Sequence, residues 1–143
     1  MTLNDVMMTL LAAGSEQTRK TYTRHGIKGA MFGVSYAVLG KLRKKIKYDQ
    51  SLAQELWETD NHDARILATM IADPSSCTAA LMEDWAKVLD NYALADALGQ
   101  LAAQTPEAHK LMTRWMQSDD EWLGQMGWTI LSTEARNGTL PDS

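Results

Sequence analysis

Three lysines in this sequence have the type and spacing to bind phosphate. Lys41, Lys44 and Lys45 recur at i, i+3 and i+4 of a predicted helix over 35–47, so their ammonium groups share one face. The apolar residues of the same segment fall on the opposite side. A lysine face of this kind can neutralise the phosphates of a polyanion. A solvated surface without a ligand is the alternative interpretation, and it is common on exposed helices.

Tyr92 and Asp96 form a second pair of interest. They are four residues apart in a predicted helix over 91–103 and therefore project from one face. Asp96 lies off the apolar stripe of that helix, so packing does not account for it. The alternative is an ordinary amphipathic helix with an exposed Asp and a half-buried Tyr.

The distribution of charge favours a polyanionic partner for the lysines. The chain has a net charge of -4, yet residues 1–50 carry nine Lys and Arg against three Asp and Glu. Residues 51–143 carry five against fifteen. Clustered basic residues at one end of an otherwise acidic protein are typical of phosphate contact. The other basic residues just before the lysine face are Arg19, Lys20, Arg24 and Lys28.

Composition excludes several classes of function. A chain of 143 residues that is 45% hydrophobic predicts one domain over 1–143. One cysteine and three scattered histidines offer no zinc-ligand spacing, and there is no phosphate-binding glycine motif, so we expect no metal and no nucleotide or other cofactor. No apolar run is long enough to span a bilayer and no export signal is present. We therefore predict a cytoplasmic protein without a membrane partner.

Helical periodicity runs through the chain, and no segment has the pattern of a strand. Most segments open with a predicted capping residue. These residues are Ser15, Ser35, Asp49, Asn61, Thr78, Asn91, Thr105 and Asp119. The predicted helices are 2–13, 15–24, 35–47, 49–59, 61–72, 78–89, 91–103, 105–117 and 119–136. This pattern predicts an all-α protein of about nine helices without a sheet.

The helices from residue 49 onward come in short pairs, which predicts an α-solenoid of two-helix repeats. The longest irregular stretch, 24–34, contains three glycines and is expected to be a shaped loop that another chain can approach closely. Residues 138–143 resemble a break followed by the first turn of a further helix. The stack is thus expected to be unfinished at this end, where two copies could associate.

Several strings together resemble the bacterial DNA alkylation repair family, the HEAT-like-repeat alkylpurine glycosylases of the AlkD type. The resemblance covers nearly the whole chain and depends on the order and spacing of the strings. They are residues 19–29, 32–35, 56–58, 63–74, 83–85, 90–96 and 118–122.

The resemblance implies a right-handed α-solenoid of HEAT-like helix pairs, lacking the last pairs of the family, whose concave basic surface binds duplex DNA. It implies hydrolysis of the N-glycosidic bond of N3- or N7-alkylated purines, with Asp96 as the catalytic carboxylate and Tyr92 lining the lesion site. Such a carboxylate stabilises an oxocarbenium-like sugar and orients water. The implied DNA contacts are Lys28, Lys41, Lys44, Lys45 and Arg65.

This sequence also departs from the family pattern. Tyr92 stands where active members carry tryptophan, and Leu123-Gly124 follows Glu121-Trp122 where those members place an arginine. Two alternatives to an active glycosylase therefore stay open. One is a DNA-binding module with weak or no catalysis, and the other is a helical scaffold that binds proteins.

Overall fold

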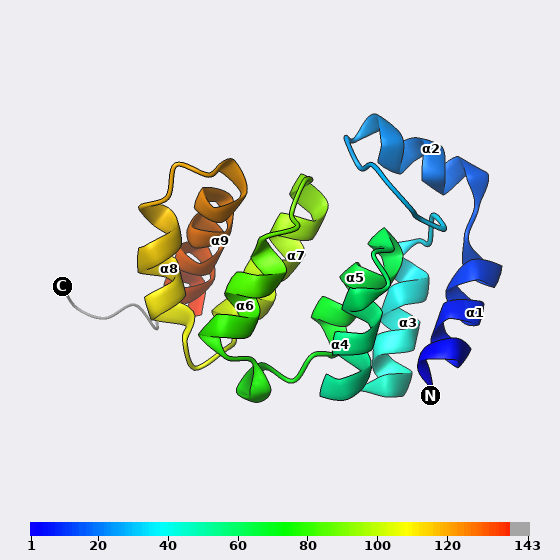
Figure 1. The fold of residues 1–143 in the computed structure, drawn as a ribbon, viewed down its shortest axis with the longest axis horizontal. Coiled ribbons are helices and arrows are strands. Elements are labelled where there is room, and N and C mark those ends of the chain that lie inside the picture. The colour runs from blue at the N-terminus through cyan, green and yellow to red at the C-terminus, as the bar shows by residue number, and fades with distance from the viewer. Residues whose placement is uncertain (138–143) are drawn as a thin grey trace. The chain divides into compact units, whose positions relative to one another are not determined.

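The computed structural model describes residues 1–137, which fold into helices and their connections (Figure 1). No strand occurs in this part of the chain, so the all-α prediction is confirmed. The predicted further turn at 138–143 lies outside the described residues. The helices are α1 (Leu3–Ala13), α2 (Glu16–Arg24), α3 (Tyr36–Ile46), α4 (Gln50–Glu58), α5 (His62–Ile71), the short 3-10 helix η1 (Pro74–Ser76), α6 (Ala79–Ala86), α7 (Tyr92–Ala103), α8 (Ala108–Met116) and α9 (Glu121–Asn137).

Most helices begin where a local side chain caps them. Most of the predicted caps accept a hydrogen bond from the backbone N–H three residues later, because a short polar side chain satisfies an N–H that the first turn leaves unpaired. Their side chains are those of Ser15, Ser35, Asp49, Asn61, Thr78 and Asn91.

The last two helices begin later than predicted. A turn around Pro106 precedes α8, which starts at Ala108 without a side-chain cap. At α9 the cap is Asp120 rather than Asp119, since Asp120 Oδ1 accepts from the N–H groups of Trp122 and Leu123 at 2.9 and 3.0 Å.

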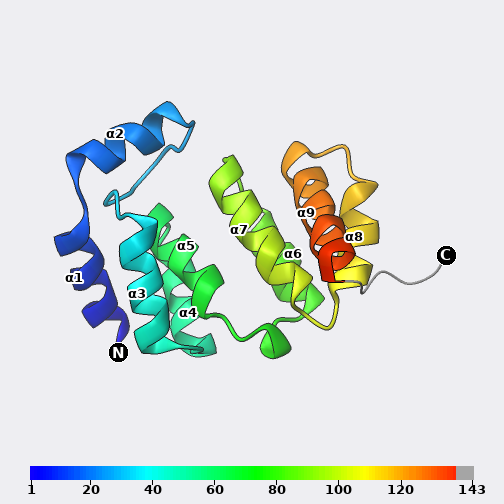
Figure 2. The ribbon, with the colours of Figure 1, turned by 180° about the vertical axis from the view of Figure 1, so that it is seen from behind.

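The contacts divide the chain into two compact units, Met1–Asp73 and Pro74–Ser143, and each is described by itself. The prediction of a single domain stays a prediction. In the first unit α5 contacts α1, α3 and α4 around a core that includes Leu10, Leu39 and Leu56. Helix α2 contributes no buried residue to this core. Figures 1 and 2 show it set apart from α3, α4 and α5 and linked back to them by the 25–35 segment.

The second unit packs α9 against both α7 and α8, with α6 beside α7. Trp85 and Trp115 are fully buried here. Helices α8 and α9 approach closely at Gly127, where an added Cβ would lie 2.9 Å from the Met116 backbone nitrogen. From α4 onward, α4 with α5, α6 with α7 and α8 with α9 thus contact each other, as the predicted two-helix repeats require.

The glycine-containing loop 25–34 is shaped as expected. Gly26, Gly29 and Gly33 all have positive φ. Gly33 has a second requirement, because a Cβ there would lie 2.6 Å from the Ser15 carbonyl oxygen and 2.7 Å from the Arg19 nitrogen. The loop therefore packs directly on the start of α2 at a position that only glycine fits.

Candidate nucleic-acid interface

The α3 basic face, which we define as Lys41, Lys44 and Lys45, is exposed as the sequence predicts. Leu39 and Leu42 on the other side of the helix are buried. Within residues 1–137 none of the three lysines forms an ion pair. The basic residues that do form ion pairs with Asp or Glu there are Lys20, Arg65, Lys87 and Arg114. A phosphate could therefore bind these ammonium groups without breaking an ion pair. Asp5 is the carboxylate nearest in effect, since its pKa is lowered mainly by its hydrogen bonds with Thr2 and to a smaller extent by Lys45.

Lys28 is exposed on the 25–34 loop, and a buried carboxylate holds the second half of that loop in place. Asp63, only 1% exposed, accepts three backbone hydrogen bonds, from the N–H of Phe32 at 2.6 Å, of Gly33 at 3.1 Å and of Val34 at 2.9 Å. Hydrogen bonds to a charged acceptor are stronger than neutral ones, so they offset the cost of burying the carboxylate. The backbone of residues 32–34, which follows Lys28 in the loop, is therefore preorganised.

Helix α2 is attached to the same loop by polar contacts. The Tyr22 hydroxyl donates to the Val34 carbonyl at 2.6 Å, and Arg19 donates to the Phe32 carbonyl at 3.0 Å. Burial raises the pKa of Tyr22 to about 12, with smaller contributions from Tyr36 and from the negative charge of Asp63. The tyrosine is therefore a neutral hydrogen-bond donor at ordinary pH.

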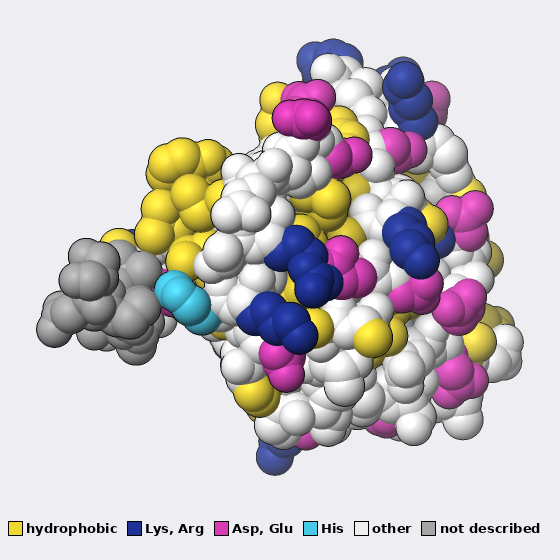
Figure 3. All heavy atoms as spheres, turned by 60° about the vertical axis from the view of Figure 1, so that its left-hand side comes forward, with side chains coloured by type: hydrophobic (Ala, Val, Ile, Leu, Met, Phe, Trp, Pro, Cys, Tyr) yellow, Lys and Arg dark blue, Asp and Glu magenta, His cyan; other side chains and the backbone are white. Residues whose placement is uncertain are grey.

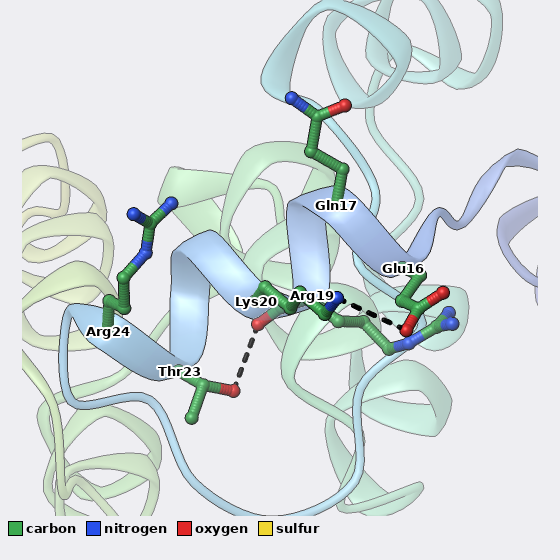
Figure 4. A pocket seen from close by; sticks show the side chains of 6 residues that line it. All are labelled: Glu16, Gln17, Arg19, Lys20, Thr23 and Arg24. Carbon is green, nitrogen blue, oxygen red and sulfur yellow. Dashed lines mark hydrogen bonds and ion pairs between the residues drawn. The ribbon is translucent and has the colours of Figure 1, made fainter.

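Six residues of α2 line a hollow of about 650 Å³ (Figure 4). Lys20 pairs with Glu16 at 3.4 Å along the helix. Arg24 points away from that pair and donates to the Thr21 hydroxyl at 3.3 Å. The basic residues predicted upstream of α3 are therefore exposed, but their charge is partly compensated by Glu16.

Arg65 makes several contacts within its own unit. Its Nε donates to the Trp57 carbonyl at 3.1 Å, its guanidinium pairs with Asp60 at 2.9 Å and it lies 5.1 Å from the centre of the Trp57 ring. The side chain is only 15% exposed. These contacts stabilise the turn between α4 and α5, and a DNA contact by Arg65 stays a prediction.

Asp96, the predicted catalytic carboxylate, is exposed on α7. Its Oδ2 accepts a hydrogen bond from Gln100 at 2.9 Å. The side chain lines a surface hollow of about 360 Å³ between α7 and α9, which we call the α7–α9 hollow. The lining residues are Asp96, Gln100, Gln125, Trp128, Thr129, Ser132 and Arg136. A carboxylate in such a hollow can reach a bound ligand.

Tyr92 is 59% exposed but is held against the start of α9. Its hydroxyl donates to Glu121 at 2.9 Å, and its ring packs edge-on against Trp122 with centroids 4.9 Å apart. The hydrogen bond to the Glu121 carboxylate raises the pKa of Tyr92. The Gln125 amide nitrogen donates to the Tyr92 carbonyl at 3.3 Å, which links Tyr92 to the α7–α9 hollow.

Sequence reasoning missed these partners on α9. Glu121 is 29 positions from Tyr92, and helical periodicity contains no information on contacts at that separation. The place of Trp128 among apolar residues of a helix favours packing, yet the side chain is 60% exposed and lines the hollow. No local sequence signal indicates this exposure, because it depends on how α9 packs on α7.

Elsewhere the surface is mixed in charge. On the face that Figure 3 brings forward, Lys and Arg side chains stand among Asp and Glu side chains.

Within residues 1–137 no three His, Cys, Asp or Glu side chains are grouped to hold a metal ion. No helix in the described part of the chain combines the length and apolarity needed to cross a membrane.

Curated relatives match along almost the entire chain. Uncharacterized protein Lin0241 of Listeria innocua is 25% identical over 99% of this chain, and Uncharacterized protein Lmo0209 of Listeria monocytogenes is 26% identical over 99%. In both cases the match spans 65% of the relative. The chain therefore covers about two thirds of the length of these proteins.

A solved structure is also similar, with a TM-score of 0.87 and 32% identity over 92% of this chain and 56% of the other. That protein is described as one of a new family related to the HEAT-like repeat DNA glycosylases with affinity for branched DNA structures. The HEAT-like character of the helix pairs is thus confirmed. Residues 6–143 match the model of the DNA alkylation repair enzyme family, and the chain belongs to that family.

Proposed function

We propose that this chain binds duplex DNA through the α3 basic face and Lys28, and that it hydrolyses the N-glycosidic bond of N3- or N7-alkylated purines at Asp96. The observation that carries the proposal is the set of three exposed lysines that form no ion pair within residues 1–137, in a chain whose net charge is -4. Membership of a DNA alkylation repair family supports DNA as the polyanion. A concave binding surface and a cytoplasmic location stay predictions.

The proposed reaction requires few catalytic groups. N3- or N7-alkylation gives the purine a positive charge, so the base leaves as a neutral molecule when the bond from C1′ breaks and its electron pair moves to the base. Asp96 stabilises the positive charge that develops on the sugar and accepts the proton of the water that attacks C1′. Its exposure and its position in a hollow support this role.

The test measures release of N7-methylguanine from alkylated duplex DNA. We expect the chain to release it faster than spontaneous loss and Asp96→Asn to abolish the difference, since the amide cannot accept the proton. Asp84→Asn is the matched control, because Asp84 is also an exposed aspartate on a helix of the second unit and does not line the hollow. Release at the spontaneous rate would contradict the glycosylase proposal.

Binding is tested separately with Lys41, Lys44 and Lys45 changed together to Ala. We expect weaker binding to duplex DNA, while a charge-matched triple change of Lys87, Lys110 and Arg114 to Ala leaves most of the affinity. Equal losses in the two variants would show that binding does not depend on the α3 basic face. Circular dichroism would establish that both variants remain folded.

A second candidate function is DNA binding without excision. Tyr92 favours this alternative, because its hydroxyl donates to Glu121 and its ring packs on Trp122, both on α9. The similar protein whose structure is solved is also described by its affinity for branched DNA. Comparison of a four-way junction with a duplex of equal length distinguishes the two candidates. Tighter binding to the junction without base release would support this alternative.

A further inference from the structure

Trp128 differs from the other tryptophans of the chain. Trp57, Trp85 and Trp115 are at most 3% exposed, and Trp122 is half-buried against Tyr92. Trp128 is 60% exposed and lines the α7–α9 hollow. Leaving an indole in water forgoes a large amount of apolar burial. Because the exposed indole lines a hollow, its ring is available to a ligand that enters there.

The surroundings of Trp128 favour a polar ligand over another helix. A helix-packing face is a stripe of apolar residues. The α7–α9 hollow instead combines the exposed indole with a carboxylate at Asp96, a guanidinium at Arg136, the amide of Gln100 and the hydroxyl of Ser132. Asp96 and Gln100 lie four residues apart on one face of α7. On α9, Trp128, Ser132 and Arg136 likewise follow each other at intervals of four residues. Both walls of the hollow are therefore helices, which hold their side chains in fixed positions.

This set of groups matches the parts of a nucleotide. An indole face stacks on a base of any sequence, and a guanidinium binds a phosphate by parallel hydrogen bonds. The guanidinium of Arg136 forms only a long hydrogen bond of 3.4 Å to the Thr133 hydroxyl, and no ion pair joins it to a carboxylate within residues 1–137. The volume of about 360 Å³ falls at the lower end of the range for small-ligand sites, roughly 300–1,000 Å³. One nucleotide is therefore a better match than a long segment.

We infer that the α7–α9 hollow is a nucleotide subsite in which Trp128 stacks on one unpaired base of a DNA strand and Arg136 binds an adjacent phosphate. The inference rests on the proposed function, because Asp96 lines the same hollow and would face the sugar. Trp128 also favours a cationic base, since the negative face of an indole attracts positive charge. The subsite thus selects strands in which a base has left the stack.

The test compares the affinity for two DNA duplexes. One is fully paired, and the other has the same sequence with one additional, bulged base in one strand. Trp128→Ala is expected to weaken binding of the bulged duplex about tenfold and to leave the paired duplex nearly unchanged, because stacking contributes only where a base is free. Trp128→Phe should recover most of the loss. Arg136→Gln should weaken the bulged duplex and lower the salt dependence of its binding.

Arg114→Gln is the matched control, since Arg114 is an exposed arginine of the same unit that does not line the hollow. Equal losses on the two duplexes, or none in Trp128→Ala, would overturn the subsite. Release of N7-methylguanine is measured in parallel on the unaltered chain. If the chain prefers the bulged duplex through Trp128 but releases no base, the subsite is supported and the glycosylase proposal is contradicted. If the chain releases the base without that preference, the glycosylase proposal is supported and the subsite is contradicted.

Discussion

Asp63 has an effect on the fold that its position in the sequence does not reveal. It is the second residue of α5, where an acidic side chain usually interacts with its own helix. Here it crosses to the 25–34 loop and accepts hydrogen bonds from residues 30 positions away. A buried carboxylate with this many donors supports a loop conformation that helical patterns cannot specify.

Asp63→Asn tests that dependence. The amide offers one oxygen in place of two and brings an NH₂ group toward a backbone donor, so we expect the free energy of unfolding to fall by about 3 kcal/mol. Denaturant unfolding measures the change. Asp49→Asn is the control, because Asp49 caps α4 and Asn caps a helix equally well. A loss below about 1 kcal/mol in Asp63→Asn would mean that the loop is held by other contacts.

Tyr22 gives a prediction on pH. Its pKa is about 12 in the folded chain and about 10 in an unfolded one, so the folded state holds the proton more tightly. The stability that this adds is complete below pH 10 and is lost as pH rises toward 12. Tyr22→Phe removes the hydroxyl and its hydrogen bond to Val34, which we expect to cost about 1 kcal/mol at pH 8.

Unfolding of the two proteins at a series of pH values measures this effect. The stability difference between the unaltered chain and Tyr22→Phe should shrink between pH 10 and 12. A difference that stays constant over this interval would show that the tyrosine titrates normally.

At the scale of the helices, much of the structure could be predicted because its causes are local. Ser35 and Asn61 each cap the helix that follows. In α3 the leucines and the lysines recur at helical spacing on opposite faces, and this pattern determines which face is buried. The cap of α9 is Asp120 instead of the predicted Asp119, since both neighbouring aspartates are good caps. The contacts of Tyr92 and the exposure of Trp128 could not be predicted, because they depend on how α9 packs on α7.

Close packing of α8 on α9 leads to a prediction with an internal control. Gly127→Ala would bring a Cβ within 2.7 Å of Met116 Cγ and 2.9 Å of its backbone nitrogen, so the helices must separate. We expect a net loss of about 1 kcal/mol, because overpacking exceeds the gain in helix propensity. Gly124→Ala on the same helix meets nothing within 4 Å and should stabilise by up to about 1 kcal/mol. Thermal unfolding of the two variants would show opposite shifts in Tm.

At the scale of the whole molecule, net charge and local charge make opposite predictions about DNA. A protein with a charge of -4 should be repelled by DNA if only its total charge acted. Binding depends instead on the cations that touch phosphates, since each releases a condensed counterion from the duplex. The Met1–Asp73 unit contains the α3 basic face and Lys28, so it should supply most of this release.

The dependence of binding on salt measures this release directly. We expect the affinity for duplex DNA to fall steeply with salt, and the triple change of Lys41, Lys44 and Lys45 to Ala to reduce the slope of log K against log salt by up to about 3, because each lost phosphate contact removes about 0.9. The triple change of Lys87, Lys110 and Arg114 alters net charge by the same amount and should leave the slope nearly unchanged. Identical slopes in the two variants would mean that the chain responds to DNA through its total charge, and the assignment of the α3 basic face would then be wrong.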